Sequence, residues 1–267
     1  MAAANKFNEL GPITKMERGN VHFAELQRAI IAYHKSQPHR VVFEADPDGL
    51  RKHARLKVDA QIPETVAAIL GDAVHNMRSA LDLLACVLAA RNGHTSGTAM
   101  RETYFPITAS KELFERGTYS AKTASWISPA TDKMKRLSSK HRDFITALSP
   151  YKGGGDDFYH LHQMDVLDKH QLLTPIAARL ALQDGPLGLN PLEERLFIWG
   201  PTRRYLEVRD DMIISTATIS EPDSALLVEG GTEIAFGQGD LAGQPVLPAL
   251  FKIGNTVYKA ITDLLAL

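Results

Sequence analysis

The sequence predicts an α+β fold, with a helical N-terminal two-thirds that includes a small β-hairpin, then a C-terminal antiparallel β-meander and a closing helix. Before residue 175, apolar residues recur every three or four positions in several long stretches, which is the period of an amphipathic helix. After Pro175, short β-prone runs alternate with glycine, proline and aspartate. Because helices precede strands instead of alternating with them, this order favours α+β over a doubly wound parallel sheet.

The composition is that of a globular protein. The chain has 267 residues, 44% of them hydrophobic, and a formal net charge of −1, which excludes a disordered chain. We expect a single domain over residues 1–267, with a helical part at about 20–175 and the meander plus terminal helix at about 176–267. One cysteine excludes a disulfide framework. Lacking a leader-like start and a long apolar run, the protein is expected to be cytoplasmic, without membrane contact.

The first expected elements are a helix and a hairpin. Residues 20–35 have helical periodicity, with Asn20 as the expected cap, and Pro38 ends the helix. Residues 40–45 and 55–62 then read as two strands joined by the turn Asp46-Pro47-Asp48-Gly49. The second run alternates apolar and charged residues, so one face of the hairpin should be solvated.

Further helices are expected over four segments, of which residues 63–91 are the best defined. Pro63 suits its first turn and Asn92-Gly93 its end. The other three helices are expected at residues 111–116, 129–148 and 157–172. The meander strands are expected at residues 196–199, 203–208, 212–219, 225–228 and 232–236, and the closing amphipathic helix at 246–267.

The helix at 63–91 carries a polar stripe opposite its apolar side. Neighbours in this stripe are three or four residues apart and therefore adjacent on the helix surface. The stripe comprises Gly71, His75, Arg78, Ser79, Asp82 and Cys86. Its ends are small and uncharged, so we expect it to meet another helix. Three interpretations remain open: a solvated face, a buried structural network that fixes Arg78, and a functional site.

A second polar motif lies in the helix at 157–172. Asp168 falls in the apolar sector of that helix, whereas Asp165 and Lys169 lie beside the sector as an i,i+4 pair. A carboxylate among leucines needs a partner, and a guanidinium suits it. We therefore predict that Arg78 and Asp168 approach each other, with His75 and His170 nearby. The alternative is an Asp168 at a frayed helix edge that water satisfies.

These segments resemble conserved blocks of a bacterial protein family that has no assigned activity. Residues 75–82 (HNMRSALD) and 167–170 (LDKH) are similar to its paired blocks HNLRSALD and LDxxDKHR. Residues 104–107 (YFPI) and 148–151 (LSPY) resemble its FPI and LQPY blocks. The resemblance spans roughly residues 60–175, and Gln171 stands where the family often has arginine. It implies which positions matter and implies no chemistry for them.

The first functional hypothesis is recognition of an anionic ligand, either a small molecule or RNA. The expected binding residues are Arg78, Ser79, Asp82, Asp168, Lys169 and His170. A basic stretch at residues 133–142 offers further phosphate contacts.

The second hypothesis is a metal-independent endoribonuclease, with His75 and Arg78 as its catalytic residues. An imidazole would serve as general base or acid and the guanidinium would hold the scissile phosphate. This loosely resembles HEPN-type nucleases, in which an arginine precedes the histidine. Here His75 comes before Arg78, whereas Arg136 and His141 have the family's order but lack its polar residue.

The third hypothesis is a structural protein in which the polar network fixes the register of a homo-oligomer interface. The sequence leaves open whether the protein is an enzyme. We expect no metal ion and no cofactor, because neither an HExxH motif nor a Cys/His pair supports the few ligand pairs available, such as His160 with His162.

Overall fold

The computed structural model describes residues 9–181, 196–199, 203–221 and 232–267. The chain divides into two compact units. The first is made of residues 1–24, 69–172 and 250–267, and the second of residues 25–68 and 173–249. The predicted α+β class is confirmed, since long helices and small antiparallel sheets coexist.

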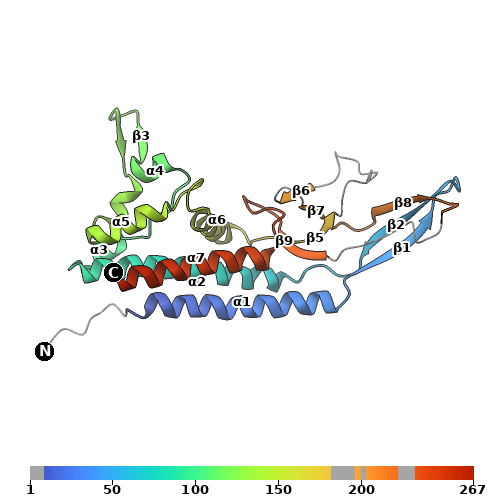
Figure 1. The fold of residues 1–267 in the computed structure, drawn as a ribbon, viewed down its shortest axis with the longest axis horizontal. Coiled ribbons are helices and arrows are strands. Elements are labelled where there is room, and N and C mark those ends of the chain that lie inside the picture. Colours follow the sequence, from blue (N-terminus) through green and yellow to red (C-terminus); the bar gives the residue numbers. More distant parts are fainter. Residues whose placement is uncertain (1–8, 182–195, 200–202, 222–231) are drawn as a thin grey trace. The chain divides into compact units, whose positions relative to one another are not determined.

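The first unit is built around the greater part of three long helices, α1 (Gly11–Lys35), α2 (Glu64–Arg91) and α7 (Val246–Ala266). In this unit they run alongside one another (Figure 1). Helix α2 contributes the largest share of the core, because its alanines and leucines are buried on most of its sides. Its fully buried large side chains are Leu70, Met77, Leu81, Leu84 and Leu88.

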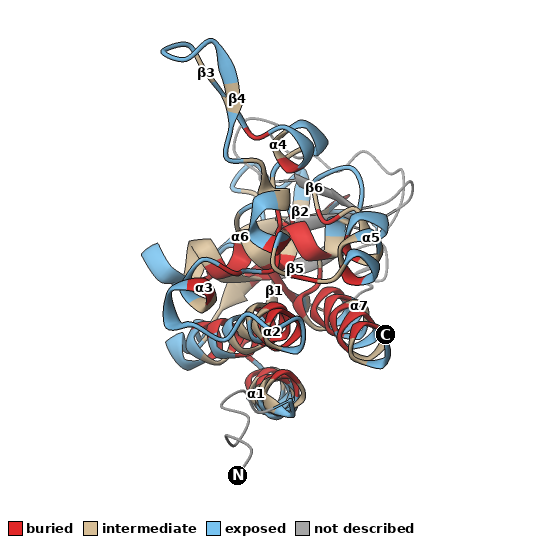
Figure 2. Ribbon diagram, turned by 90° about the vertical axis from the view of Figure 1, so that its left-hand side faces the viewer, coloured by how far each residue is buried: buried red, intermediate tan, exposed pale blue. Residues whose placement is uncertain are grey.

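Shorter helices complete the first unit. They are α3 (Gly97–Arg101), α4 (Lys111–Glu115), the 3-10 helix η1 (Ala130–Met134), α5 (Ser139–Leu148) and α6 (Asp156–His170). The side chains of Ser96, Ser110 and Ser138 cap α3, α4 and α5, each accepting a backbone N–H three residues later. Strands β3 (Thr118–Ser120) and β4 (Ser125–Ile127) form an exposed hairpin (Figure 2).

The second unit contains two antiparallel sheets. Strands β1 (His39–Ala45), β2 (Arg51–Val58) and β8 (Met212–Thr218) form the first, with β2 central. Its small apolar cluster comprises Ala54, Leu56, Ile214 and Ala217. The second sheet has the order β6-β7-β5-β9, made of β6 (Leu196–Trp199), β7 (Arg203–Glu207), β5 (Pro175–Ala181) and β9 (Thr232–Phe236).

Several elements lie where the sequence placed them. The helices predicted at 63–91, 157–172 and 246–267 are α2, α6 and α7, each within two residues of the expected ends. Strands β6 and β9 have the expected bounds. The strand expected at 225–228 lies outside the described residues.

Other expectations were wrong at their boundaries or in their pairing. Helix α1 begins at Gly11 instead of Asn20, because Pro12 suits a first turn and the helix continues through residue 20. The helix expected at 129–148 is interrupted where Ser138 starts α5. The strands do not form a simple meander, since β8 pairs with β2 and the unpredicted β5 separates β7 from β9. The N-terminal two-thirds is therefore not simply helical.

No helix among the described residues is both long enough and apolar enough to span a lipid bilayer.

Candidate functional site

Helices α2 and α6 bring a carboxylate and two basic groups together in the first unit. Helix α6, seen nearly end-on in Figure 1, crosses α2, which runs across the view. Asp165 of α6 is buried, and one of its oxygens lies 3.0 Å from Nδ1 of His75 on α2. Its other oxygen lies 2.5 Å from Nζ of Lys169, one helical turn later. Since a carboxylate only accepts hydrogen bonds, Nδ1 of His75 carries the hydrogen.

The basic partners of Asp165 form the accessible edge of this cluster. The side chains of His75 and Lys169 are 51% and 53% exposed, whereas that of Asp165 is 3% exposed. The other imidazole nitrogen, Nε2, lies 3.4 Å from the hydroxyl of Ser79, the residue one turn along α2. The cluster therefore presents to solvent an imidazole whose orientation a buried carboxylate fixes.

Arg78, on the same side of α2, has its hydrogen-bonding groups occupied within the protein. Its two terminal nitrogens donate to Oδ1 of Asp82 at 2.8 Å and to the carbonyl of Phe105 at 3.1 Å. The backbone N–H of Phe105 donates to the same Asp82 oxygen, which closes a ring of three hydrogen bonds. The guanidinium side chain is only 9% exposed, so it is not available to a ligand.

Burial has a larger effect on the pKa of Asp82 than its hydrogen-bonded partners have. Desolvation raises the pKa of this carboxyl, although the nearby Arg78 charge and the Phe105 N–H both act to lower it. Cys86, one turn further along α2, lies against the carbonyl of Thr103 at 3.7 Å, and burial likewise raises the pKa of its thiol. This half of the stripe thus holds the backbone of residues 103–105 and has no exposed reactive group.

The predicted Arg78–Asp168 pair was wrong. Asp168 lies instead against the backbone of α2 at Gly71, where an added Cβ would come within 2.6 Å of the Asp168 carboxyl carbon. The apolar sector expected for α6 took in Asp168, which is only half-buried. The buried side passes through Phe158, Leu161 and Asp165. Asp165 is therefore the carboxylate that α6 buries.

The other residues predicted for the site have different fates. Ser79 and Lys169 belong to the cluster, whereas Asp82 accepts the backbone N–H of Phe105. His170, at the end of α6, is exposed, and the structure gives it no bond to the cluster. The expectation that the stripe meets another helix is confirmed at its first half, where Gly71 and His75 contact α6.

Asp165 and His162 belong to the site, although the sequence did not identify them as site residues. Burial lowers the pKa of His162, and the charges of Arg78 and Lys169 lower it further, against the opposing effect of Asp165. Its Nδ1 atom is buried and finds no hydrogen-bond partner within the described ranges. Spacing alone did not single out Asp165, because Asp165 follows the buried Leu161 by four residues and Asp168 follows the buried Met164 by four.

The four blocks that carry the family resemblance come together in this unit. The backbone N–H of Thr108, next to the YFPI block, donates to the carbonyl of Pro150 in the LSPY block at 3.1 Å. The rings of Phe105 and Phe158 lie 5.7 Å apart, linking the YFPI block to α6. The α2 block holds Phe105 through Arg78 and Asp82.

The basic stretch at 133–142 is partly used within the fold. Arg136 forms an ion pair with Glu102, and Arg142 donates to the carbonyl of Leu137. His141 is buried, with its Nδ1 at 2.8 Å from the hydroxyl of Ser138. The Arg136–His141 pair, which has the HEPN-like order, therefore presents no exposed imidazole. The exposed basic residues that remain are Lys133, Lys135 and Lys140.

Over the residues that the structure describes, no group of three or more histidine, cysteine or acidic side chains is arranged to hold a metal ion. Comparisons of the chain with models of known protein families, with curated proteins and with solved structures found no match.

Proposed function

We propose that the exposed edge formed by His75 and Lys169 binds a phosphodiester anion, and that the protein is a metal-independent endoribonuclease with His75 as its general base. The observation that carries this proposal is the hydrogen bond from His75 Nδ1 to the buried Asp165, at 3.0 Å. It leaves Nε2 free of hydrogen on a half-exposed side chain, the state that accepts a proton.

The chemistry needs only groups that this edge contains. Nε2 of His75 takes the proton of an RNA 2′-hydroxyl as that oxygen attacks the adjacent phosphorus. The phosphorus–5′-oxygen bond breaks, the 5′-oxygen takes a proton from a water molecule, His75 releases its proton to the resulting hydroxide, and a 2′,3′-cyclic phosphate remains. The ammonium of Lys169, bound to the other oxygen of Asp165, supplies positive charge beside the imidazole for the phosphate oxygens.

Lys169 replaces Arg78 in the phosphate-binding role that the sequence suggested. Both hydrogen-bonding ends of Arg78 are used inside the fold, whereas more than half of the Lys169 side chain is exposed. We expect binding to be electrostatic and to weaken as salt rises, without reading the base sequence.

The experiment is incubation of the full chain with single-stranded RNA in the presence of a chelator. We expect cleavage that His75→Ala lowers by a factor of about 100 or more, because a general base contributes that much. Lys169→Gln should weaken RNA binding. His170→Ala is the matched control, an exposed histidine on the same helix as Asp165, and should leave the rate unchanged. Equal rates for the parent chain and His75→Ala would refute the proposal.

The position of Ser79 beside the His75 imidazole raises a second candidate function. Its hydroxyl lies 3.4 Å from Nε2, so Asp165, His75 and Ser79 follow the order of a serine-hydrolase triad. Ser79 lies inside α2, however, where backbone N–H groups are engaged in the helix and cannot stabilise an oxyanion. A fluorophosphonate probe separates the two functions: the ribonuclease proposal predicts no label on Ser79 and full RNA cleavage by Ser79→Ala.

A further inference from the structure

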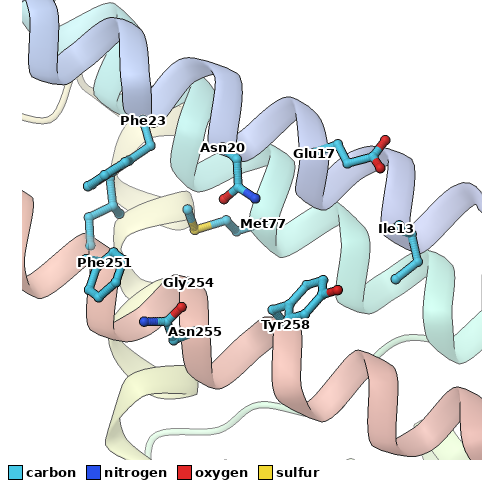
Figure 3. Close-up of a pocket in the computed structure, with 10 residues that line it drawn as sticks. Ile13, Glu17, Asn20, Phe23, Met77, Phe251, Gly254, Asn255 and Tyr258 are labelled. Carbon is cyan, nitrogen blue, oxygen red and sulfur yellow. The ribbon is translucent and has the colours of Figure 1, made fainter.

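A groove in the first unit lies apart from the His75 edge. Helices α1 and α7 form its walls and Met77 of α2 forms its floor (Figure 3). Its volume is about 380 Å³, within the range of small-molecule sites. Lining residues recur three or four positions apart along both helices, so each wall is one helix face. They are Ile13, Glu17, Asn20, Phe23, Met77, Leu250, Phe251, Gly254, Asn255 and Tyr258.

Aromatic rings mark one end of the groove. The rings of Phe23 and Phe251 lie 6.3 Å apart and tilted, and Figure 3 shows them at the same end. Phe251 remains 61% exposed, so its ring is accessible to an occupant of the groove. Tyr258 adds a third ring nearer the opposite end.

Four polar groups of the lining are unused by the protein. In the described part of the chain, the side chains of Glu17, Asn20, Asn255 and Tyr258 make no hydrogen bond or ion pair. Glu17 is the one charged residue of the lining. It lies six residues before Phe23 on α1, which places it about 9 Å along the helix axis from the aromatic end.

The basic residues on the neighbouring helix faces bond to other acceptors and do not neutralise Glu17. Lys15 donates to Asn76, Lys252 pairs with Asp157 and Lys259 pairs with Asp263. The groove therefore combines an apolar, ring-lined end with one unpaired negative charge.

Gly254 keeps the floor of the groove open. A glycine inside a helix destabilises it by about 1 kcal/mol relative to alanine. Packing does not require that loss, because a Cβ at Gly254 would lie 3.4 Å from the flexible end of Met77, an ordinary contact. The missing side chain leaves room for an occupant instead.

We propose that this groove binds a small aromatic ammonium compound, with its ring against Phe23 and Phe251 and its amine paired with Glu17. The two amides, Asn20 and Asn255, lie between these ends and donate or accept hydrogen bonds along the ligand. The negative charge of Glu17 favours the ammonium form over a neutral or anionic analogue.

Calorimetric titration of the full chain with three indole compounds of similar size tests the charge preference. Tryptamine carries the ammonium, tryptophol a hydroxyl and indole-3-propionate a carboxylate. We expect tryptamine to bind about tenfold more tightly than tryptophol, and indole-3-propionate to bind least. Glu17→Gln should weaken tryptamine binding to the level of tryptophol. Glu112→Gln, an exposed acid on α4, should change nothing.

Substitutions at Gly254 test the shape of the site. Gly254→Ala should leave the melting temperature unchanged or higher and weaken all three compounds, and Gly254→Leu should abolish their binding. If Gly254→Leu does not fold, Phe251→Ala, which removes an exposed ring, should weaken all three by a factor of about five. Absence of tryptamine binding at millimolar concentration, a preference for indole-3-propionate, or full affinity in Glu17→Gln would overturn the proposal.

Discussion

At the scale of single residues, the role of Arg78 depends on what its guanidinium can reach. The sequence identified it as a cation that needs an acid, and the structure supplies that acid four residues away as Asp82. The second donor reaches the Phe105 carbonyl, which no side-chain pattern in the sequence indicates. A residue that looked like a ligand contact therefore holds a loop against a helix.

Arg78→Ala should lower the free energy of unfolding by about 3 kcal/mol, because it leaves a partly buried carboxylate and a carbonyl without their donor. Arg78→Lys should lose a smaller part, since an ammonium lacks the planar fork that spans both acceptors. Urea denaturation measures both. Lys111→Ala removes an exposed i,i+4 pair and should cost less than about 1 kcal/mol. Equal losses at the two positions would show that the Arg78 ring contributes little.

At the scale of elements, the contact between α2 and α6 explains how far the sequence could predict the site. The 3.6-residue period located both helices and grouped His75, Arg78, Ser79 and Asp82 on one side of α2. The period could not decide which acid of α6 would be buried. Asp165 and Asp168 are three residues apart, and the choice between them depends on how α6 is rotated against α2.

The missing side chain of Gly71 lets Asp168 approach α2, and this close contact limits how α6 is rotated against α2. Gly71→Ala would force its Cβ against the Asp168 carboxyl, so we expect a loss of about 1–3 kcal/mol despite the better helix propensity of alanine. In an Asp168→Ala background the clash is absent, and the same change should stabilise α2 by about 1 kcal/mol. Chemical denaturation of the four chains gives the coupling energy. Additive effects would contradict the close approach of Asp168 to Gly71.

At the scale of the whole molecule, both units contain histidines whose pKa is lowered. Burial is the main cause that lowers the pKa values of His34 and His39 in the second unit and of His141 and His162 in the first. Nearby cations also contribute for the latter two. Because all four pKa values are lowered, these histidines all change the stability of the fold in the same direction as the pH falls.

Because the folded-state pKa lies below the unfolded value of about 6.5, the unfolded chain takes up protons first as the pH falls. The stability that these histidines contribute is therefore complete above pH 6.5 and is lost as the pH falls through that value toward the folded pKa. Urea midpoints measured between pH 8 and 5 should decrease. His162→Gln should make this decrease shallower, whereas His170→Gln, an exposed site, should not. A midpoint that rises toward pH 5 would contradict this linkage.

The order in which the strands pair within the two sheets also could not be predicted from the sequence. Local β-propensity placed β6 and β9, but pairing between distant segments is not encoded in any one run of residues. The sequence therefore did not show that β8 would join the N-terminal hairpin or that residues 175–181 would form the central strand β5.

The proposed general base depends most on the orientation of the His75 ring. Nitrogen-15 NMR of the imidazole groups at pH 8 reads the tautomer of each histidine directly. We predict that neutral His75 carries its hydrogen on Nδ1, because Asp165 accepts it there, and that Asp165→Ala releases this preference. A His75 protonated on Nε2 in the parent chain, unaffected by loss of Asp165, would contradict the oriented imidazole and with it the proposed general base.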